Sequence, residues 1–425
     1  MSSTAPVVRT FEWSPPAADD ALSSLRADEV LAGDDPLHGE AMTINMGPQH
    51  PATHGVLRLV ITLDGETIRA VEPVVGYLHR GKEKTCESLG WAKFFPHTDR
   101  LDYVQPLMNN VGYALALEKL AGIQVPERGQ VIRVLLMELS RVAAHLIYLG
   151  TTAIDLGAVT MFFHTFKERE RIYSFLDAYT GHRMNNTYVR IGGVYADVDE
   201  RVEAELRRFL EQFPARVDEF EAMLTRNSIW HDRNRGVGVL TREQALAWSL
   251  TGPNLRGSGV ELDLRKAAPY SGYEGYEFDV PVGAAGDAYD RYLVRVEEMR
   301  QSLRIVEQAL AKLPKGPVIV DDRKIALPPK SEVYSNIESL MNHFKLVYDG
   351  ILPPAGEVYG YNEGANGEQA FYIVSDGRKF PWRVKCRPPC FAVYQAFPEM
   401  IKGMLLADAV ATIGGLNVIA GELDR

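Results

Sequence analysis

The sequence predicts an α+β protein whose centre is a bundle of long helices. Five stretches carry apolar residues at spacings of three and four, the period of an amphipathic helix, and the first three end in glycine. Short runs rich in β-branched residues lie on both sides of these stretches, beside the turn dipeptides Asp-Gly and Asn-Gly. Such segregation of strands and helices is typical of α+β folds. The helical stretches are 107–122, 130–150, 158–181, 198–225 and 287–313.

The composition is that of an ordinary globular chain. Of the 425 residues, 46% are apolar and 24% are charged, which excludes global disorder and allows two or three subdomains. A formal net charge of −10 disfavours a nucleic-acid groove, since phosphates require clustered cations. Three cysteines can form neither a disulfide framework nor a four-thiolate metal cluster. Any redox metal is therefore expected to belong to a partner.

Residues 1–41 are expected to be a flexible acidic arm. The first 40 of them hold eight acidic side chains against two basic ones, and no apolar core of signal-peptide length. In the body, the two most apolar stretches are 131–163 and 404–421. Charged residues interrupt both, so neither reaches the roughly 18 apolar residues expected of a transmembrane helix. We expect a soluble or peripheral protein in the cytosol.

The body is predicted to begin with a β-rich region, residues 42–105. Two β-rich runs, 57–63 and 67–71, flank Asp64-Gly65, which is a strong hairpin signal. The helical bundle follows over residues 106–313. Within it, residues 252–283 are rich in glycine, tyrosine and proline, and their aromatic content predicts an ordered wrapping loop.

Residues 314–425 are predicted to form a mixed α/β region. The pattern indicates a short strand and a helix, then a hairpin with Asn366-Gly367 near its turn, and a final helix. The expected bounds are 318–320, 331–348, 357–374 and 399–413, in that order.

The loop from Gly47 to Gly55 contains the first candidate residues, His50 and His54. Two histidines four apart can share a metal only on one helix face, and the glycines and prolines of this loop forbid a helix. Two interpretations remain. Both histidines could satisfy local turn hydrogen bonds, or the rigid loop could aim an imidazole into a cavity.

Tyr103 and Asp155 are the next candidates. Tyr103 follows a loop rich in charge and could be an interior aromatic, or a phenol that donates a hydrogen bond to a carbonyl oxygen. Asp155 lies among apolar residues, where a carboxylate is costly unless it is paired or caps a helix. It could be the N-cap of the helix that begins at Ala158, or the partner that holds a histidine protonated.

Other polar residues give weaker signals. Glu138, Arg141 and His145 share one helix face and are expected to form an interior ion-pair ladder. Arg80 lies in a basic turn, which could be a solvated surface or a positive group that stabilises an anionic cluster. The cysteines match no metal or redox pattern and are expected to be buried thiols. They are Cys86, Cys386 and Cys390.

Several long motifs, in order along residues 42–425, make this chain resemble the D-subunit family of proton-pumping NADH:quinone oxidoreductase, respiratory complex I. That family is similar to the large subunit of nickel–iron hydrogenases. The resemblance implies a hydrogenase large-subunit-like fold and a place in the peripheral arm. Such a protein forms the quinone-reduction pocket with an adjacent iron–sulfur protein and couples quinone reduction to proton translocation. The motifs are MGPQHPATHGVLRL, GYLHRGKEKTCES, DRLDYV, ELSRVAAHLIYLGTTAIDLGA, RIGGV, SGVELDLRKAAPYSGYEGYEFDVPVG and YIVSDG.

The resemblance also implies roles for particular residues. His54 and Tyr103 would contact the quinone headgroup, and Asp155 would lie near His54 and couple to it. Arg80 would lie near the terminal 4Fe-4S cluster of the neighbouring B-subunit. An imidazole and a phenol could then supply hydrogen bonds and protons to the two carbonyl oxygens of the quinone. Loss of the His54 proton would leave the charge of Asp155 unbalanced.

The implied substrate is a quinone, with no cofactor or metal bound by this chain alone. The implied partners are the iron–sulfur B-subunit, the C-subunit, the other peripheral-arm subunits and a membrane-arm protein at the quinone entrance. The implied location is peripheral, at the cytoplasmic face of the cell membrane.

Two departures from related families matter. Hydrogenase large subunits bind metals through two Cys-x-x-Cys pairs, which are absent here, so nickel chemistry is disfavoured. Many quinone-linked relatives have a histidine near the terminal cluster where this chain has Asn185. We expect a lower and less pH-dependent cluster potential, which would suit menaquinone. The alternative function is that of a scaffold in a related hydrogenase-like or ferredoxin-accepting membrane complex.

Overall fold

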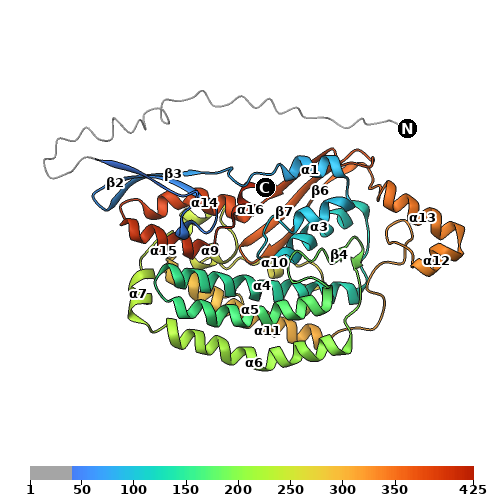
Figure 1. The fold of residues 1–425 in the computed structure, drawn as a ribbon, viewed down its shortest axis with the longest axis horizontal. Coiled ribbons are helices and arrows are strands. Elements are labelled where there is room, and N and C mark those ends of the chain that lie inside the picture. The colour runs from blue at the N-terminus through green and yellow to red at the C-terminus, as the bar shows by residue number, and fades with distance from the viewer. Residues whose placement is uncertain (1–40) are drawn as a thin grey trace, which may run out of the picture.

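Five long helices form the centre of the molecule, as predicted. The structure, a computed structural model, describes residues 41–425, and the expected acidic arm over residues 1–40 lies outside them. Four of them, α4, α5, α6 and α11, run side by side in the lower half of Figure 1, with α3 above them, and α4 packs against α5, α11 and α3. The long helices are α3 (Pro106–Ala121), α4 (Glu127–Asp155), α5 (Val159–Thr180), α6 (Glu200–Leu224) and α11 (Ala288–Ala311).

The helix ends follow the glycine signals at two positions and depart from them at a third. Gly122 and Gly181 end α3 and α5 with positive φ angles, as predicted. The prediction that Gly150 closes α4 is wrong, because this helix continues to Asp155. A Cβ atom on Gly150 would lie 2.5 Å from Oγ1 of Thr165 on α5, so the glycine allows the two helices to approach.

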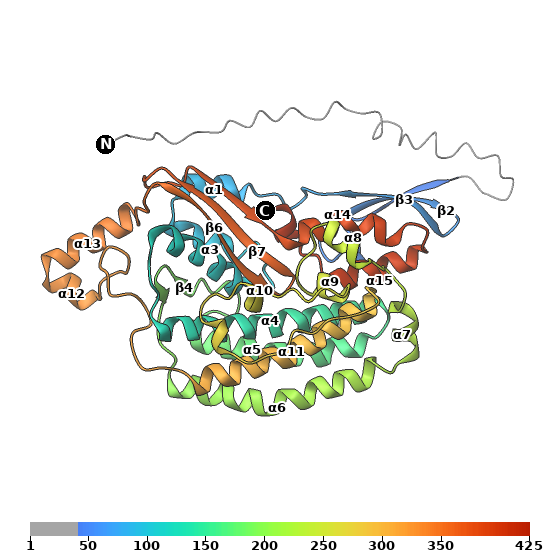
Figure 2. The same cartoon turned by 180° about the vertical axis from the view of Figure 1, so that it is seen from behind.

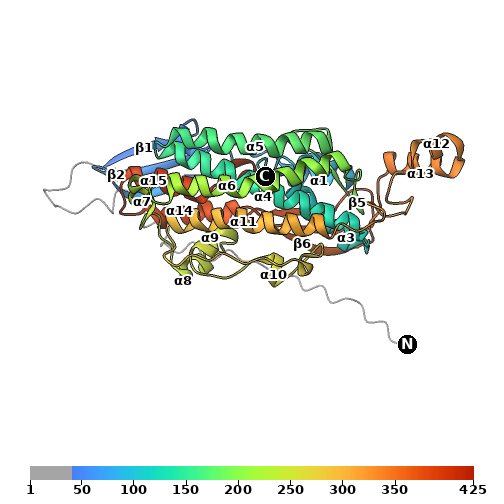
Figure 3. The same cartoon turned by 90° about the horizontal axis from the view of Figure 1, so that it is seen from below.

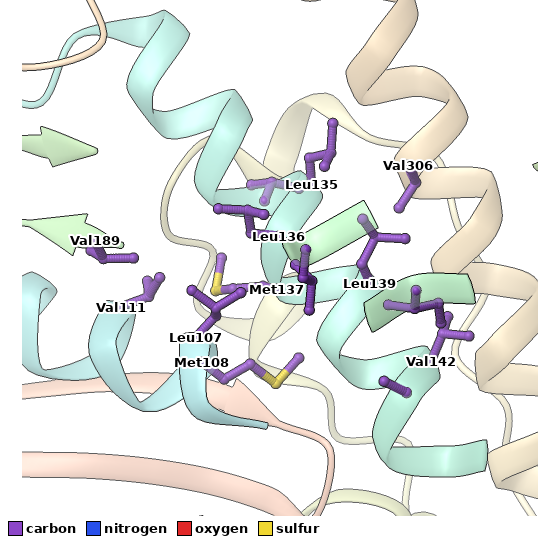
Figure 4. Packing of buried hydrophobic residues seen from close by; sticks show 14 of the residues in the cluster. Leu107, Met108, Val111, Leu135, Leu136, Met137, Leu139, Val142, Val189 and Val306 are labelled. Atoms are coloured by element: carbon purple, nitrogen blue, oxygen red, sulfur yellow. The ribbon is translucent and has the colours of Figure 1, made fainter. Parts of the chain in front are cut away.

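A single apolar cluster fills the bundle. Figure 4 shows its centre, where side chains of α3, α4 and α11 meet around the buried middle of α4. Burial of this apolar surface is the main driving force for the fold. The labelled residues are Leu107, Met108, Val111, Leu135, Leu136, Met137, Leu139, Val142, Val189 and Val306.

The N-terminal region is a three-stranded antiparallel sheet that contains the predicted hairpin. Strands β2 (Arg58–Asp64) and β3 (Thr67–Val74) pair across the Asp-Gly turn, and β1 (Met42–Met46) adds to the far edge of β2. Alternate residues of β2 are buried, as expected for a sheet with one covered face. Helix α14 (Pro389–Ile401) packs against β3 and covers that face.

The second predicted hairpin is also present, in a C-terminal sheet over α3. Strands β6 (Gly356–Gly364) and β7 (Gly367–Ser375) pair antiparallel, and β8 (Arg383–Arg387) pairs with the other edge of β7. Figure 2 shows β6 and β7 lying diagonally across α3.

Three of the C-terminal predictions are wrong in detail. The expected helix 331–348 is split into α12 (Lys330–Ser335) and α13 (Ile337–Tyr348), because Asn336 is extended and caps the second helix through its side chain. The expected strand 318–320 is only an isolated bridge between Ile319 and Gly193.

The expected final helix, 399–413, is instead the end of one helix and the start of another. Helix α14 ends at Ile401, and Gly403 has a φ of 81°, which breaks the helical path before α15 (Leu406–Leu416). Asn417 then adopts the left-handed conformation and leads to α16 (Ala420–Asp424). These three helices carry the C-terminal residues back to the N-terminal sheet.

Short elements complete the fold. The aromatic segment 252–283 is ordered and lies along one side of the bundle, where its helices α9 and α10 appear near the bottom of Figure 3. No helix within residues 41–425 is long and apolar enough to cross a membrane. The short elements are α1 (Lys82–Leu89), α2 (Phe95–Thr98), α7 (Ser228–Asn234), α8 (Arg242–Ala247), α9 (Gly252–Gly257), α10 (Leu264–Ala267), β4 (Val189–Arg190), β5 (Gly193–Val194), and the 3-10 turns Pro51–Thr53, Ala92–Phe94 and Tyr273–Gly275.

Candidate functional site

The loop after β1 holds its two histidines in different roles. His50 precedes the 3-10 turn Pro51–Thr53, and its Nδ1 accepts a hydrogen bond from the backbone N–H of Ala52 at 3.2 Å. His54 ends the same turn in the left-handed conformation, with φ 47° and ψ 43°. This turn directs the His54 ring away from the loop, to a residue 101 positions later in the sequence. The local interpretation therefore holds for His50 and not for His54.

The partner of His54 is Asp155. Nε2 of His54 lies 2.5 Å from Oδ2 of Asp155, with side-chain exposures of 17% and 8%. Asp155 is the last residue of α4, whereas α5 has no side-chain cap at Ala158, so the N-cap interpretation of Asp155 is wrong. A carboxylate at this distance from a ring nitrogen makes a charge-assisted hydrogen bond when the ring is protonated.

Helix α15 lies beside the carboxylate end of this pair. A Cβ atom on Gly414 would lie 3.5 Å from Oδ2 of Asp155, and Oγ1 of Thr152 donates to the Gly414 carbonyl at 3.2 Å. The same helix contacts the 3-10 turn that precedes His54. The outer side of Asp155 borders a pocket of about 250 Å³ between α7 and α15. Helix α15 thus packs directly against the end of α4 that carries Asp155.

Tyr103 lies on the segment that leads into α3, and it is half-buried. Burial, followed by the charges of Asp102 and Cys390, raises the pKa of its phenol to about 12. No group within residues 41–425 hydrogen-bonds its hydroxyl. Within the described residues, the phenol is therefore protonated at neutral pH and can donate a hydrogen bond to a ligand.

Helix α16 brings Tyr103 and the His54 loop to neighbouring positions. A Cβ atom on Gly421 would lie 3.3 Å from Cδ1 of Tyr103, and a Cβ atom on Gly55 would lie 3.9 Å from the Cβ of Ala420. Two consecutive residues of α16 therefore contact the two loops that carry the predicted headgroup ligands. Sequence reasoning missed this helix, because its residues carry no local signal of a site.

Arg80 lies apart from the His54–Asp155 pair. Its side chain is exposed, and its backbone N–H donates to the Arg425 carbonyl at 3.3 Å. The turn before Arg80 is bound to Asp424 of α16, whose carboxylate accepts hydrogen bonds from the backbone N–H groups of Gly76 and Leu78 at 2.8 and 2.7 Å. The Arg80 loop is thus fastened to the end of α16.

A buried lysine beside this loop was not predicted. Lys82 is only 6% exposed, and its Nζ donates to the Arg100 carbonyl. Burial, together with the charges of Arg100 and Arg80, lowers the pKa of Lys82 to about 8. Three cationic side chains therefore stand together at this end of the molecule, an arrangement suited to stabilising an anionic neighbour.

The expected ion-pair ladder on α4 is correct only in part. Arg141 pairs with Glu138 at 3.2 Å, but His145 turns to Glu298 of α11 at 2.8 Å, and all four side chains are buried. Burial lowers the pKa of His145 to about 4, so its ring is neutral at ordinary pH. Glu138 also accepts a hydrogen bond from the Tyr273 hydroxyl at 2.6 Å, so the network links three elements.

The cysteines are buried and free, as predicted. Within residues 41–425, no three His, Cys, Asp or Glu side chains are placed to hold a metal ion.

Comparison with known proteins identifies the relatives of this chain. Residues 155–425 match the family described as "Respiratory-chain NADH dehydrogenase, 49 Kd subunit". The NADH-quinone oxidoreductase D-subunit of Geotalea uraniireducens is 50% identical over 386 residues, which cover 91% of this chain and 99% of that protein. The D-subunit of Methylacidiphilum infernorum is 49% identical over 406 residues, covering 96% and 97%. A D-subunit of Chloroflexus aurantiacus is 50% identical over 389 residues, covering 91% and 95%.

Proposed function

Since this chain belongs to the family of the 49 kDa subunit of respiratory-chain NADH dehydrogenase, we propose that it forms the quinone-reduction pocket of NADH-quinone oxidoreductase, with His54 and Tyr103 at the headgroup. The chain is an oxidoreductase component of complex I, as its similarity to the D-subunit proteins indicates. The observation that carries the pocket assignment is the 2.5 Å contact between His54 and Asp155.

The chemistry of this site suits quinone reduction. Conversion of a quinone to a quinol takes two electrons and two protons, one at each carbonyl oxygen. Tyr103 offers an uncommitted hydroxyl, and a protonated His54 offers a second donor held by Asp155. When His54 gives up its proton, the negative charge of Asp155 is left without its partner. In this proposal, the local change in charge triggers proton translocation in the membrane arm.

The electrons are proposed to come from a 4Fe-4S cluster in the iron–sulfur B-subunit, close to Arg80. The cationic side chains of Arg80, Lys82 and Arg100 support this position of the cluster, since a cluster held by thiolates carries negative charge. The chain itself supplies no cofactor in this proposal. Reduced quinone would leave toward the membrane-arm protein at the quinone entrance.

An exposed apolar helix face supports further contacts with the C-subunit and other peripheral-arm proteins. On α13, Ile337 is 73% exposed and Phe344 59%, and this helix protrudes at the right of Figure 1. Exposed patches of this kind mark protein–protein contacts. We place the assembled protein at the cytoplasmic face of the cell membrane, held there peripherally by its partners.

Menaquinone is the proposed substrate because of Asn185. Its Oδ1 is buried without a hydrogen-bond partner in the described chain, and an amide adds no titratable cation beside the cluster. The cluster potential should then be low and nearly independent of pH. Redox titration of the cluster in the intact complex measures this, and a steep pH dependence would contradict the menaquinone assignment.

The pocket assignment is tested with His54→Ala and Tyr103→Phe in the assembled complex. Both variants should lose most NADH:quinone reductase activity, whereas NADH oxidation by a water-soluble artificial acceptor should be unchanged. His50→Ala is the matched control, because among residues 41–425 the His50 ring hydrogen-bonds only within its own loop. Wild-type quinone reductase rates in both variants, with assembly intact, would refute the assignment. The alternative of a non-catalytic scaffold predicts that result.

A further inference from the structure

A buried carboxyl group lies directly before Tyr103 and has no role in the proposal above. Asp102 is completely buried, and three neutral donors surround it. Its Oδ1 accepts from the backbone N–H of Val104 at 3.0 Å, and its Oδ2 accepts from the side-chain amides of Gln105 and Asn366 at 2.5 and 3.1 Å. Both oxygens therefore behave as acceptors, which is the behaviour of an ionised carboxylate.

A second buried carboxyl group, on α16, faces the first. Glu422 is 1% exposed, and its Oε1 accepts from the backbone N–H of Cys390 at 3.0 Å. Its Oε2 is buried and receives no donor from residues 41–425, and the side chain is in hydrogen-bonding contact with Asp102. Two ionised carboxylates in such contact would repel each other and leave Oε2 unsatisfied. One proton on Glu422 turns Oε2 into a donor to Asp102 and removes both penalties.

The surroundings do not offer an ion pair in place of this proton. In the described chain neither carboxylate has a salt-bridge partner, and the charged or titratable groups that sense their charge include Lys82, Tyr103, Tyr173 and Cys390. Of these only Lys82 can be cationic, and it is itself committed to the Arg100 carbonyl. Burial raises the pKa of both carboxyl groups, and that of Glu422 well above its ordinary value.

The pair joins the two segments that meet at Tyr103. Asp102 precedes Tyr103 in the chain, and Gly421 precedes Glu422. A Cβ atom on Gly421 would lie 2.8 Å from the Leu101 carbonyl oxygen and 3.3 Å from the Tyr103 ring, so the two backbones are in close contact. A repulsive pair of charges at this point would drive these segments apart.

We propose that Asp102 and Glu422 share one proton, and that this protonated pair is a positioning element that clamps Tyr103 against α16 in the quinone pocket. The inference rests on the proposed function, since it gives Tyr103 its place there. The single remaining negative charge also disfavours a phenolate at Tyr103 and so keeps the hydroxyl a donor. When the pair loses its proton at alkaline pH, the clamp opens and quinone reduction fails.

The test compares the pH profiles of wild-type, Glu422→Gln and Glu422→Leu complexes. A glutamine amide donates to Asp102 at every pH, so Glu422→Gln should keep the wild-type rate at neutral pH and move the alkaline half-point upward by about one pH unit or more. Glu422→Leu removes the donor and should lose quinone reductase activity at all pH values. Rates are normalised to NADH oxidation by a water-soluble acceptor at each pH. The infrared band of a protonated carboxyl group should disappear in Glu422→Gln.

Three outcomes would overturn the inference. They are an unchanged alkaline limb in Glu422→Gln, a Glu422→Gln complex as impaired as Glu422→Leu, or failure of Glu422→Gln to assemble. The His54→Ala and Tyr103→Phe variants separate this failure from that of the proposed function. If they lose quinone reduction while Glu422→Gln leaves the pH profile unchanged, the pocket assignment stands and the shared proton does not.

Discussion

Asp155→Asn tests the central pair with little change in shape. Asparagine keeps the volume of aspartate and can still hydrogen-bond a neutral imidazole, but it cannot stabilise a positive charge on His54. The contact is 2.5 Å long, and the Asp155 side chain is 8% exposed, so solvent screens it only weakly. A hydrogen bond to a charged group is worth about 1.5–3 kcal/mol, and the 17% exposure of His54 places this one near the middle of that range.

About 2 kcal/mol of lost stabilisation corresponds to roughly a 30-fold decrease in rate. We therefore expect Asp155→Asn to lower the NADH:quinone reductase rate about 30-fold in the assembled complex, with electron transfer to a water-soluble acceptor retained. Steady-state assays on membranes with matched complex content measure both rates. The hydrogen bond from Thr152 to α15 remains, so the variant should assemble normally.

A matched control exists on α7. His231 and Asp232 form a second His–Asp pair, but they are 36% and 79% exposed and 3.7 Å apart, so the pair contributes little. Asp232→Asn should leave the quinone reductase rate unchanged. An Asp155→Asn complex that assembles and turns over at the wild-type rate would refute the reasoning, because it would show that the charge of Asp155 does not matter to the reaction.

Three further substitutions have defined outcomes. Arg133→Leu should destabilise the protein by about 3–5 kcal/mol, because it leaves the buried carboxylate of Glu118 without its bidentate partner, and thermal unfolding or loss of assembly measures this. Gly421→Ala should cost about 1–3 kcal/mol and slow quinone reduction, since its methyl group would lie 2.8 Å from the Leu101 carbonyl oxygen and 3.3 Å from the Tyr103 ring and would displace this segment, and a wild-type rate would contradict the close contact. Burial lowers the pKa of Lys82 to about 8, so the unfolded chain binds more protons than the folded one between pH 8 and 10.5. Wild-type stability should therefore rise across that window relative to Lys82→Met, by about 3 kcal/mol, as denaturation at several pH values would show.

The features that sequence predicted well are those with a local signal. Both hairpins follow from turn dipeptides, and the long helices follow from periodicity and from glycines such as Gly122 and Gly181. The helix breaks at Asn336 and Gly403 were missed, because a single residue with a non-helical backbone interrupts an otherwise helical pattern. Periodicity cannot detect such a residue.

The candidate site was predicted in its residues but not in its connections. The resemblance predicts His54, Tyr103 and Asp155 as site residues, and the structure places His54 in direct contact with Asp155. The contact between Asp102 and Glu422 could not be foreseen, because the residues are far apart in sequence and each alone is an ordinary acid. Only the tertiary fold places them together.

The position of α16 has a consequence for how this protein is made. The helix that adjoins both the His54 loop and Tyr103 consists of residues 420–424, so these groups cannot reach their final arrangement until residues 420–424 have been synthesised. The buried face of the N-terminal sheet likewise stays uncovered until α14 (Pro389–Ile401) has been made. Asp424 of α16 accepts hydrogen bonds from the backbone N–H groups of Gly76 and Leu78, so the turn before Arg80 also reaches its final arrangement only after α16 has been made.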